Sequence, residues 1–420
     1  MTEEEMKSIL FQMGEKAKIA SYVLAGMSCT DKDRCLNAMA DAVERAAKEI
    51  KKENKKDLKA GEEKGLSKSM LDRLTLNDER IKAMADGLRV LTTLEDPVGK
   101  DLDVTIRPNG LKINKVSVPL GVIGIIFESR PNVTVDAAGL CFKAGNAVLL
   151  RGGSEAINSN LVLAHILNKA GLASGMPDGV VQLVPFTDRA GVGIMAQMDQ
   201  HLDLIIPRGG EGLIRAVVAQ ATIPVIKHYK GVCHQFVDST GDLESALDIV
   251  ENSKVQRPGV CNAIESLIIH RDVAAKFAPM IATRLKESGV ELRGDREFCS
   301  FVEDATVVSE EDWYEEYLDL IISVRIVGSV GEAIAHINKY GSGHSDGIIS
   351  NDHDSVERFL NQVDSSTVYH NASTRFTDGA EFGMGCEIGI STDKLHARGP
   401  MGLTELTTYK YLVSGEGQIR

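Results

Sequence analysis

Between residues 118 and about 230, short apolar runs alternate with segments of helical pattern, and this alternation constrains the fold more than any other feature. Each run is a few residues long and largely apolar, which is typical of a buried strand. The predicted strands are residues 122–127, 147–150, 180–184, 202–206 and 224–226, and the predicted helices are 133–144, 154–168 and 213–220. Repeated strand–helix units of this length predict a parallel, doubly wound sheet.

The same alternation returns between residues 231 and 400 and predicts a second α/β domain. The predicted strands there are residues 264–270, 321–327 and 347–350, and the predicted helices are 242–252, 272–288, 330–339 and 352–361. A chain of 420 residues is also too long for one compact core, which favours two or three domains.

Two segments outside these series have other patterns. Residues 1–95 show helical spacing of apolar side chains, with Asp31 and Asn77 as predicted N-caps. Residues 101–118 alternate apolar and polar side chains on both sides of Pro108-Asn109-Gly110, which predicts a β-hairpin. A two-stranded ribbon is unstable alone, so we expect an oligomerisation arm, with a C-terminal strand at 403–413 beside it.

Charge and composition exclude several classes of partner. The net charge is −13 and the pI about 5.3, so neither nucleic acid nor an anionic membrane is an expected partner. The longest apolar run, residues 116–127, is too short and too broken to span a bilayer, and the acidic N-terminus lacks the apolar core of a signal peptide. The seven cysteines are scattered and form no CxxC pair, which predicts a reduced, cytoplasmic protein. No histidine and glutamate have HExxH spacing, so we expect no catalytic metal.

The loop Gln256–Ala263 is the candidate for covalent chemistry. Its sequence, Gln-Arg-Pro-Gly-Val-Cys-Asn-Ala, brings Cys261 directly before a predicted buried strand. A thiol in such a turn can be held rigidly beside exposed backbone N–H groups, and a covalent catalyst needs both. Taken alone, the segment favours an ordinary small, buried cysteine. A Cys/His pair with His228 is conceivable, although His234 and His270 compete for that role.

Two glycine-rich turns could bind phosphate groups. Arg208-Gly209-Gly210-Glu211-Gly212 and Arg151-Gly152-Gly153-Ser154 each follow a predicted strand and precede a helix. Backbone N–H groups at a helix N-terminus favour anions, and an arginine can hold a nucleotide phosphate. Neither turn is a GxGxxG fingerprint, and glycine is common in such turns. Two of them in one domain favour a dinucleotide site.

Four long motifs occur in a fixed order, at Val118–Thr134, Lys143–Gly153, Ile206–Gly210 and Gln256–Ala263. They resemble those of the γ-glutamyl phosphate reductases, also called glutamate-5-semialdehyde dehydrogenases, a branch of the aldehyde dehydrogenase superfamily that serves proline biosynthesis. The resemblance covers essentially the whole chain and implies an aldehyde-dehydrogenase-like α/β fold. The implied parts are a cofactor-binding domain of residues 1–100 and 118–230, a catalytic domain of 231–402, and an oligomerisation arm of 101–117 and 403–420.

The resemblance also implies roles for single residues. It places the nucleophile at Cys261 and the oxyanion-hole asparagine near Asn132. Ser154 stands where NAD-preferring members carry a glutamate, and with Arg151 beside it there is room and charge for a 2′-phosphate, which favours NADP(H). The implied cofactor contacts are Arg151, Ser154, Gly209, Gly210 and Glu316. Arg257, which is close to the cysteine in sequence, is a candidate substrate contact that could stabilise the thiolate or bind the leaving phosphate, and the alternative is a surface ion pair. By superfamily position, Gly389 and Ser391 are the candidate contacts for the substrate carboxylate.

The implied reaction is the NADPH-dependent reduction of L-glutamyl 5-phosphate to L-glutamate 5-semialdehyde through a Cys261 thioester, with release of phosphate. Glutamate 5-kinase is the candidate partner, and a homo-oligomer is expected. Hydrolytic superfamily members carry a water-activating glutamate about where this chain has His228, and a reductase needs no such water. Three alternatives are an oxidising dehydrogenase for another small aldehyde, a cofactor-free thiol acyltransferase or hydrolase, and a non-catalytic nucleotide-binding subunit.

Overall fold

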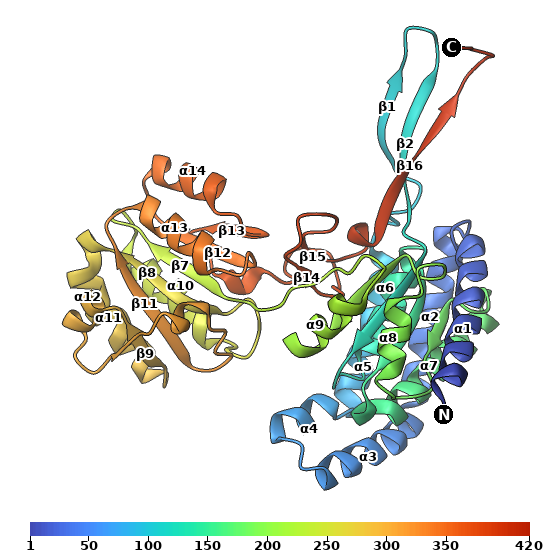
Figure 1. Ribbon diagram of the computed structural model, residues 1–420, viewed down its shortest axis with the longest axis horizontal. Coiled ribbons are helices and arrows are strands. Elements are labelled where there is room, and N and C mark those ends of the chain that lie inside the picture. The colour runs from blue at the N-terminus through green and yellow to red at the C-terminus, as the bar shows by residue number, and fades with distance from the viewer. The chain divides into compact units, whose positions relative to one another are not determined.

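The computed structural model describes residues 1–420, apart from the side chain of Ser69, and the chain divides into two compact units (Figure 1). Unit 1 comprises residues 1–227, 383–389 and 401–420, and unit 2 comprises residues 228–382 and 390–400. Each unit has its own parallel sheet and its own hydrophobic clusters. The predicted α/β class, with a parallel sheet in each of two domains, is confirmed.

The sheet of unit 1 has four parallel strands in the order β5-β4-β3-β6. These strands are β3 (Val122–Phe127), β4 (Ala147–Gly152), β5 (Val181–Leu183) and β6 (Leu204–Arg208). Every residue of β3 and β4 is buried, which explains why the runs are continuously apolar rather than alternating. Residues 224–226, predicted as a strand, make only a single bridge, between Val225 and Ile205.

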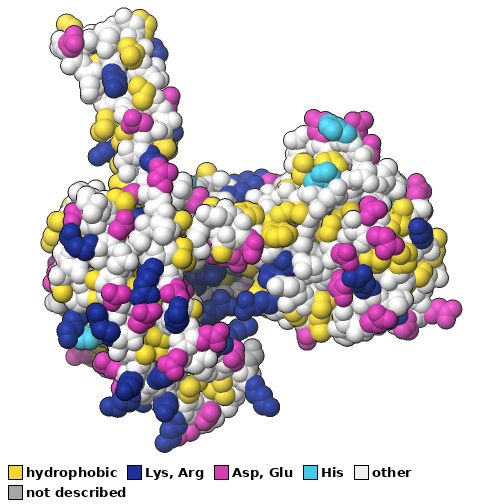
Figure 2. Space-filling view, turned by 180° about the vertical axis from the view of Figure 1, so that it is seen from behind, with side chains coloured by type: hydrophobic (Ala, Val, Ile, Leu, Met, Phe, Trp, Pro, Cys, Tyr) yellow, Lys and Arg dark blue, Asp and Glu magenta, His cyan; other side chains and the backbone are white. Residues whose placement is uncertain are grey.

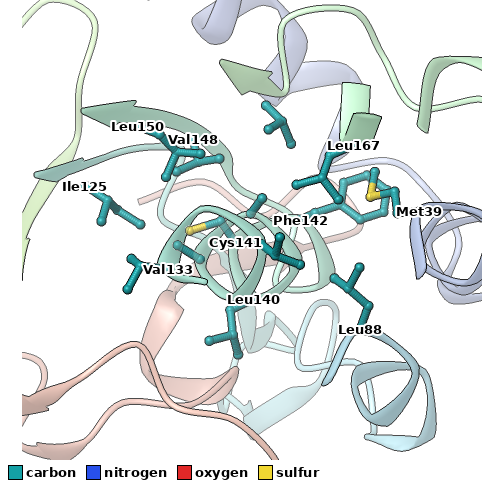
Figure 3. Close-up of a cluster of buried hydrophobic side chains, with 14 of the residues drawn as sticks. Met39, Leu88, Ile125, Val133, Leu140, Cys141, Phe142, Val148, Leu150 and Leu167 are labelled. Atoms are coloured by element: carbon teal, nitrogen blue, oxygen red, sulfur yellow. The ribbon is translucent and has the colours of Figure 1, made fainter. Parts of the chain in front are cut away.

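In the described part of unit 1, the helical elements are nine α-helices and two short 3₁₀ turns. They are α1 (Glu3–Leu24), α2 (Cys29–Arg45), α3 (Ala47–Glu63), α4 (Lys68–Leu74), α5 (Asp78–Thr93), α6 (Val133–Lys143), η1 (Ser154–Ala156) with α7 (Ile157–Ala173), α8 (Ala190–Ala196) and α9 (Glu211–Gln220), and the turn η4 (Thr404–Leu406) comes from the C-terminal segment. Helix α6 is buried on all sides, because Leu140 and Phe142 lie among side chains of β3, β4, α2, α5 and α7 (Figure 3). Asn77 caps α5 as predicted, accepting from the Arg80 N–H at 2.8 Å.

The start of α2 differs from the prediction. Ser28, not Asp31, is its N-cap: the Ser28 hydroxyl accepts from the Asp31 backbone N–H at 3.1 Å. Asp31 instead lies in the first turn, where a carboxylate is favoured by the helix dipole. The apolar spacing that begins at Leu36 does not locate the cap, because the first turn of α2 is polar.

The predicted hairpin and the predicted C-terminal strand beside it are both present, although that strand covers Thr407–Ser414 rather than 403–413. Strands β1 (Asp101–Ile106), β2 (Lys112–Pro119) and β16 (Thr407–Ser414) form an antiparallel ribbon in the order β1-β2-β16. It projects from the helical layers of unit 1 (Figure 1). Apolar side chains are exposed along it (Figure 2), namely Leu102, Val104, Ile106, Tyr409, Tyr411, Leu412 and Val413. Its role in oligomerisation stays a prediction.

The sheet of unit 2 has seven parallel strands in the order β10-β9-β11-β8-β7-β12-β13. They are β7 (Cys233–Val237), β8 (Ile264–His270), β9 (Glu291–Gly294), β10 (Thr306–Val307), β11 (Ile321–Val327), β12 (Ser345–Ile349) and β13 (Thr367–His370). The bounds of β8 and β11 match the prediction, whereas β7, β9, β10 and β13 were not predicted. Those four carry polar side chains or are too short to give an apolar pattern.

The remaining elements of unit 2 connect and cover these strands. They are α10 (Leu243–Val255), α11 (Arg271–Glu287), α12 (Arg296–Phe301), η2 (Glu311–Tyr314), α13 (Val330–Tyr340), α14 (His353–Gln362), η3 (Thr374–Phe376), and the short pair β14 (Ile390–Ser391) and β15 (Gly399–Pro400). Among the described residues, none of the helices of either unit has the length and apolar character needed to cross a membrane.

Candidate active site

Cys261 lies in the turn between α10 and β8, and we call residues Gln256–Asn262 the nucleophile loop. The Ala263 N–H donates to the Val260 carbonyl at 3.1 Å, which closes the turn directly before the strand. Gly231 packs against the backbone of the half-buried cysteine: a Cβ at Gly231 would lie 2.1 Å from the Cys261 carbonyl oxygen. Only glycine permits this approach, and the approach fixes the backbone that carries the thiol.

A second segment, at η3, holds the nucleophile loop through Asn262, the residue after the cysteine. The Asn262 amide donates to the Thr377 carbonyl at 2.8 Å, and the Thr374 hydroxyl donates to the Asn262 carbonyl at 2.7 Å. Arg375 donates from Nη1 to Asn262 Oδ1 and from Nε to Gln256 Oε1, the latter at 2.8 Å. One guanidinium therefore bridges the first and last residues of the loop.

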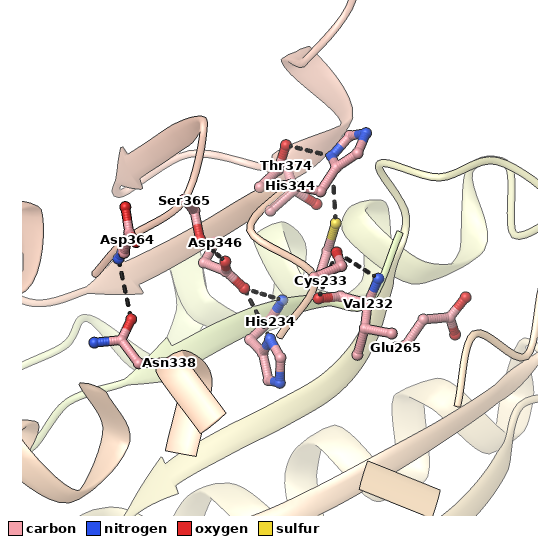
Figure 4. A network of polar contacts seen from close by, with 12 residues as sticks. Val232, Cys233, His234, Glu265, Asn338, His344, Asp346, Asp364, Ser365 and Thr374 are labelled. Carbon is pink, nitrogen blue, oxygen red and sulfur yellow. Dashed lines mark hydrogen bonds and ion pairs between the residues drawn. The ribbon is translucent and has the colours of Figure 1, made fainter. Parts of the chain in front are cut away.

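A second cysteine, Cys233 (Figure 4), contacts the backbone of Cys261. The Cys233 Sγ donates to the Cys261 carbonyl oxygen at 3.1 Å and lies 3.6 Å from His344 Nδ1. Burial raises the pKa of the Cys233 thiol well above its usual range, so this sulfur stays protonated at neutral pH. A protonated, buried thiol is a poor nucleophile, which leaves Cys261 as the candidate of the pair.

The three candidate histidines have different surroundings. His228 Nδ1 lies 2.8 Å from the Ile390 carbonyl oxygen, which can only accept, so Nδ1 carries a proton and the ring is oriented. His234 is fully buried, and its Nδ1 lies 2.8 Å from Asp346 (Figure 4). His270 is the N-cap of α11. His234 and His270 thus have structural partners of their own.

Arg257 belongs to the nucleophile loop, and Glu316 contacts the glycine that packs on it. Glu316 Oε1 accepts from the Gly231 N–H at 2.8 Å, and Gly231 is the glycine that packs on Cys261. Arg257 is exposed, and its charge lowers the pKa of Arg375 after the larger effect of burial. The chain therefore brings Cys261, Glu316 and Arg257 together within unit 2.

In unit 1, the glycine-rich turn between β6 and α9 has open positions. A Cβ built on Gly210 or Gly212 would meet no atom within 4 Å. The Gly210 N–H donates to Glu128 Oε2 at 3.1 Å, and the same carboxylate packs against Gly209. The turn at the N-terminus of α9 is thus shaped to receive an acidic oxygen.

The second turn follows β4, at the same edge of the sheet. Arg151 is buried, and its Nη2 donates to the Thr187 carbonyl at 2.7 Å. Its Nε is buried without an acceptor among the described residues, and burial lowers its pKa. Ser154, three residues later, is exposed. The carboxyl edge of a parallel sheet is where such folds bind dinucleotides.

The other predicted site residues of unit 1 lie near Arg208. Asn132 is exposed at the start of α6, and its amide donates to Asp136 at 2.8 Å. Burial raises the pKa of Asp136 to about 6, against the opposing effects of the Asn132 hydrogen bond and the Arg208 charge. Gly389 has φ +155° and packs against Arg208, whose Nη1 would lie 3.0 Å from a Cβ there.

Ser391 belongs to unit 2 and is buried, with its hydroxyl accepting from the Asp393 N–H at 3.2 Å. Sequence reasoning did not identify Asn262, Arg375 or Cys233 as part of the site. Only Asn262 had a local signal, because it follows the cysteine directly. Among the described residues, no group of three or more His, Cys, Asp or Glu side chains could hold a metal ion.

The chain is similar to proteins of known family along nearly its whole length. The sequence model of the aldehyde dehydrogenase family matches residues 7–318. The gamma-glutamyl phosphate reductase of Geotalea daltonii is 56% identical over 404 residues, which cover 96% of this chain and 97% of that protein. The protein of the same name from Clostridium novyi is 52% identical over 415 residues, covering 99% of this chain and 100% of that protein.

A solved structure supports the same assignment. The crystal structure of gamma-glutamyl phosphate reductase from Thermotoga maritima superposes with a TM-score of 0.96 at 44% identity, covering 98% of this chain and 99% of that one. The chain therefore belongs to the aldehyde dehydrogenase family, in the branch of the gamma-glutamyl phosphate reductases.

Proposed function

We propose that this protein reduces L-glutamyl 5-phosphate to L-glutamate 5-semialdehyde and releases phosphate, with NADPH as reductant and Cys261 as covalent nucleophile. The observation that carries the proposal is the full-length similarity to gamma-glutamyl phosphate reductases. The half-buried Cys261, held by Gly231 and the η3 segment, supplies the chemistry that such a reduction needs.

The first half of the reaction is acyl transfer to sulfur. The Cys261 thiolate attacks the C5 carbonyl carbon, a C–S bond forms, and the bond from C5 to the phosphate oxygen breaks. The electron pair of that bond leaves with phosphate. The backbone N–H of Cys261 is the proposed donor to the oxyanion, because the packing of Gly231 fixes its position. From the family resemblance we extend the second donor role to Asn132, with Gly389 and Ser391 as the substrate-carboxylate contacts.

In the second half of the reaction, the Cys261 thioester is reduced rather than hydrolysed. His228 stands about where hydrolytic members of the superfamily carry the carboxylate that activates water, and its Nδ1 is held on the Ile390 carbonyl. A thioester that resists hydrolysis persists until it is reduced. This difference favours reduction over oxidation as the working direction.

The chain uses a nicotinamide cofactor, which when bound supplies the hydride that turns the acyl carbon into an aldehyde. The residues of unit 1 fit such a group: the turn at Gly210 and Gly212 is open, and the Arg151 Nε is buried without an acceptor among the described residues. We propose that Gly209 and Gly210 face the pyrophosphate, that Arg151 and Ser154 face the adenosine ribose and its 2′-phosphate, and that Glu316 holds the nicotinamide ribose.

Arg151→Ala is expected to raise the KM for NADPH roughly 10- to 100-fold, because a charge-assisted contact with the 2′-phosphate is lost. The KM for NADH, which lacks that phosphate, should change little and so reports whether the site survives the substitution. Ser154→Glu should raise the KM for NADPH and lower that for NADH. Steady-state kinetics with both cofactors measure this. Equal increases for both cofactors in Arg151→Ala would mean that the arginine has only a structural role.

A reverse assay tests the proposed reaction. Glutamate 5-semialdehyde, inorganic phosphate and NADP⁺ are mixed with the protein, and reduced nicotinamide is followed by absorbance. We expect a rate that depends on phosphate, because phosphate must attack the thioester. The same rate without phosphate would identify an oxidising aldehyde dehydrogenase. No absorbance change under any condition would favour a thiol acyltransferase.

We infer further that the protein works in the cytoplasm as a homo-oligomer. The exposed apolar side chains of the β1-β2-β16 ribbon support an oligomer, because such a surface is costly in water. Glutamate 5-kinase is the proposed partner, since an acyl phosphate hydrolyses readily and its transfer between enzymes would limit that loss.

A further inference from the structure

Arg375 is held beside the nucleophile without a carboxylate partner. Its Nε donates to Gln256 Oε1 at 2.8 Å, and its Nη1 donates to Asn262 Oδ1. Both acceptors are neutral amide oxygens, so they orient the guanidinium without neutralising its charge. Among the described residues, none accepts a hydrogen bond from Nη2 or forms an ion pair with this arginine.

The electrostatic surroundings of Arg375 favour an added anion. Partial burial and the neighbouring Arg257 both lower its pKa, whereas Asp378 and the Cys261 thiolate act in the opposite direction. The guanidiniums of Arg257 and Arg375 repel each other, and partial burial increases this repulsion. A bound anion would reduce it, so anion binding at these two side chains is favoured. Arg375 is also only half-buried, so a ligand can reach it from solvent.

The geometry selects the kind of anion. The guanidinium of Arg375 is fixed at two of its nitrogens, and Arg257 is exposed on the same loop. Planar guanidiniums bind tetrahedral oxyanions through paired N–H groups, more strongly than they bind single-oxygen acceptors. A phosphate group with two negative charges matches two arginines in charge.

We propose that Arg375, together with Arg257, forms the binding site for the phosphate group of the acyl phosphate. This proposal rests on the proposed function. As Cys261 attacks and the bond from C5 to oxygen breaks, the electron pair moves onto the departing phosphate, and the two arginines stabilise that charge. In the reverse direction they hold inorganic phosphate for attack on the thioester. Gln256 and Asn262 act as positioning residues.

Arg375→Gln is expected to raise the KM for inorganic phosphate in the reverse assay about 10- to 100-fold, because a charge-assisted contact is lost. The KM values for semialdehyde and NADP⁺ should stay within about twofold. Arg257→Gln should shift the same constant in the same direction. Arg271→Gln is the matched control: it removes one positive charge at the opposite end of β8, where Arg271 pairs with Glu297 at 2.7 Å.

A second measurement does not depend on turnover. Inorganic phosphate should slow the alkylation of Cys261 by iodoacetamide in the unchanged protein and in Arg271→Gln, but not in Arg375→Gln. Peptide mass spectrometry reads the rate at Cys261, and the exposed Cys29 in unit 1 is the internal reference. Loss of protection at Cys261 with an unchanged rate at Cys29 supports the site.

The outcomes separate the two proposals. If the unchanged protein needs phosphate but Arg375→Gln keeps its KM for phosphate within twofold, the arginine site is wrong and the reaction stands. A parallel rise of all three KM values would show that Arg375 only holds the loop. If Arg375→Gln does not fold, Arg257→Gln decides, since Arg257 is exposed. A phosphate-independent rate in the unchanged protein overturns the proposed function instead.

Discussion

Replacing Cys261 with alanine is expected to lower the rate of acyl phosphate reduction by about 10⁴-fold or more, because no other group can form the thioester. Binding of NADPH should be unchanged, since none of the proposed cofactor contacts lies on the nucleophile loop: Arg151, Ser154, Gly209 and Gly210 belong to unit 1, and Glu316 follows η2 in unit 2. Nicotinamide absorbance measures turnover, and titration of NADPH fluorescence measures binding. The two readouts together distinguish a lost nucleophile from a lost fold.

Cys233→Ala is the informative companion variant. Its sulfur lies next to Cys261 and donates to the Cys261 carbonyl at 3.1 Å, so a misassigned nucleophile would most plausibly be this one. We expect Cys233→Ala to keep most of its activity, because burial holds this thiol protonated. If Cys261→Ala still turned over while Cys233→Ala did not, the roles of the two cysteines would be reversed.

The parallel core could be predicted from sequence where both faces of a strand are buried in apolar surroundings. Strands β8 and β11 are mostly apolar, with Ile, Leu or Val at four or five of their seven positions, and their predicted bounds match the structure. Strand β7 was missed because it carries His234 and Gln235. Both are buried there, where His234 Nδ1 contacts Asp346 and the Gln235 amide donates to the Ala372 carbonyl, and these partners come from more than 100 residues downstream. A local sequence pattern cannot show that hydrogen-bond partners so distant in sequence allow these polar side chains to be buried.

Some residues of the candidate site could likewise be predicted from a local sequence pattern, and others could not. Cys261 stands out locally because a Pro-Gly turn precedes it and an apolar strand follows. Arg375 has no such signal: its neighbours in sequence are unremarkable, and its relation to the nucleophile loop arises only when η3 packs against that loop. The turn at Arg151 was visible in sequence, but the buried, unsatisfied Nε that supports a ligand there was not.

A buried ion pair next to the nucleophile loop is the second feature with a large expected effect. Lys254, near the end of α10, lies 2.5 Å from Glu265 on β8, and both side chains are almost fully buried. The other carboxylate oxygen of Glu265 accepts from the Leu318 N–H at 3.2 Å. Burial raises the pKa of Glu265 to about 7 and lowers that of Lys254, so the surroundings oppose both charges.

Lys254→Met is therefore expected to destabilise unit 2 by about 3–5 kcal/mol, because Glu265 is left buried without its cation. The double variant Lys254→Met/Glu265→Leu should regain most of that stability, since two apolar side chains replace the pair. Urea unfolding followed by the fluorescence of Trp313, the single tryptophan, measures this within unit 2. Arg271→Met, which breaks the exposed pair with Glu297, should shift the midpoint only slightly.

The destabilisation caused by Lys254→Met is expected to depend on pH, because Glu265 titrates near neutrality. The pKa of Glu265 in the folded protein lies above its value of about 4.3 in an unfolded chain, so the folded state binds its proton more tightly. Its contribution to stability is present at low pH and is lost as the pH rises through about 7. The charge of Lys254 lowers this pKa, so the pKa of Glu265 in the folded protein rises further when Lys254 is removed. The loss of folding stability then continues to higher pH. The destabilisation in Lys254→Met should thus be larger at about pH 8.5 than at about pH 6. An equal effect at both values would mean that Glu265 stays protonated throughout and that the pair is not ionic.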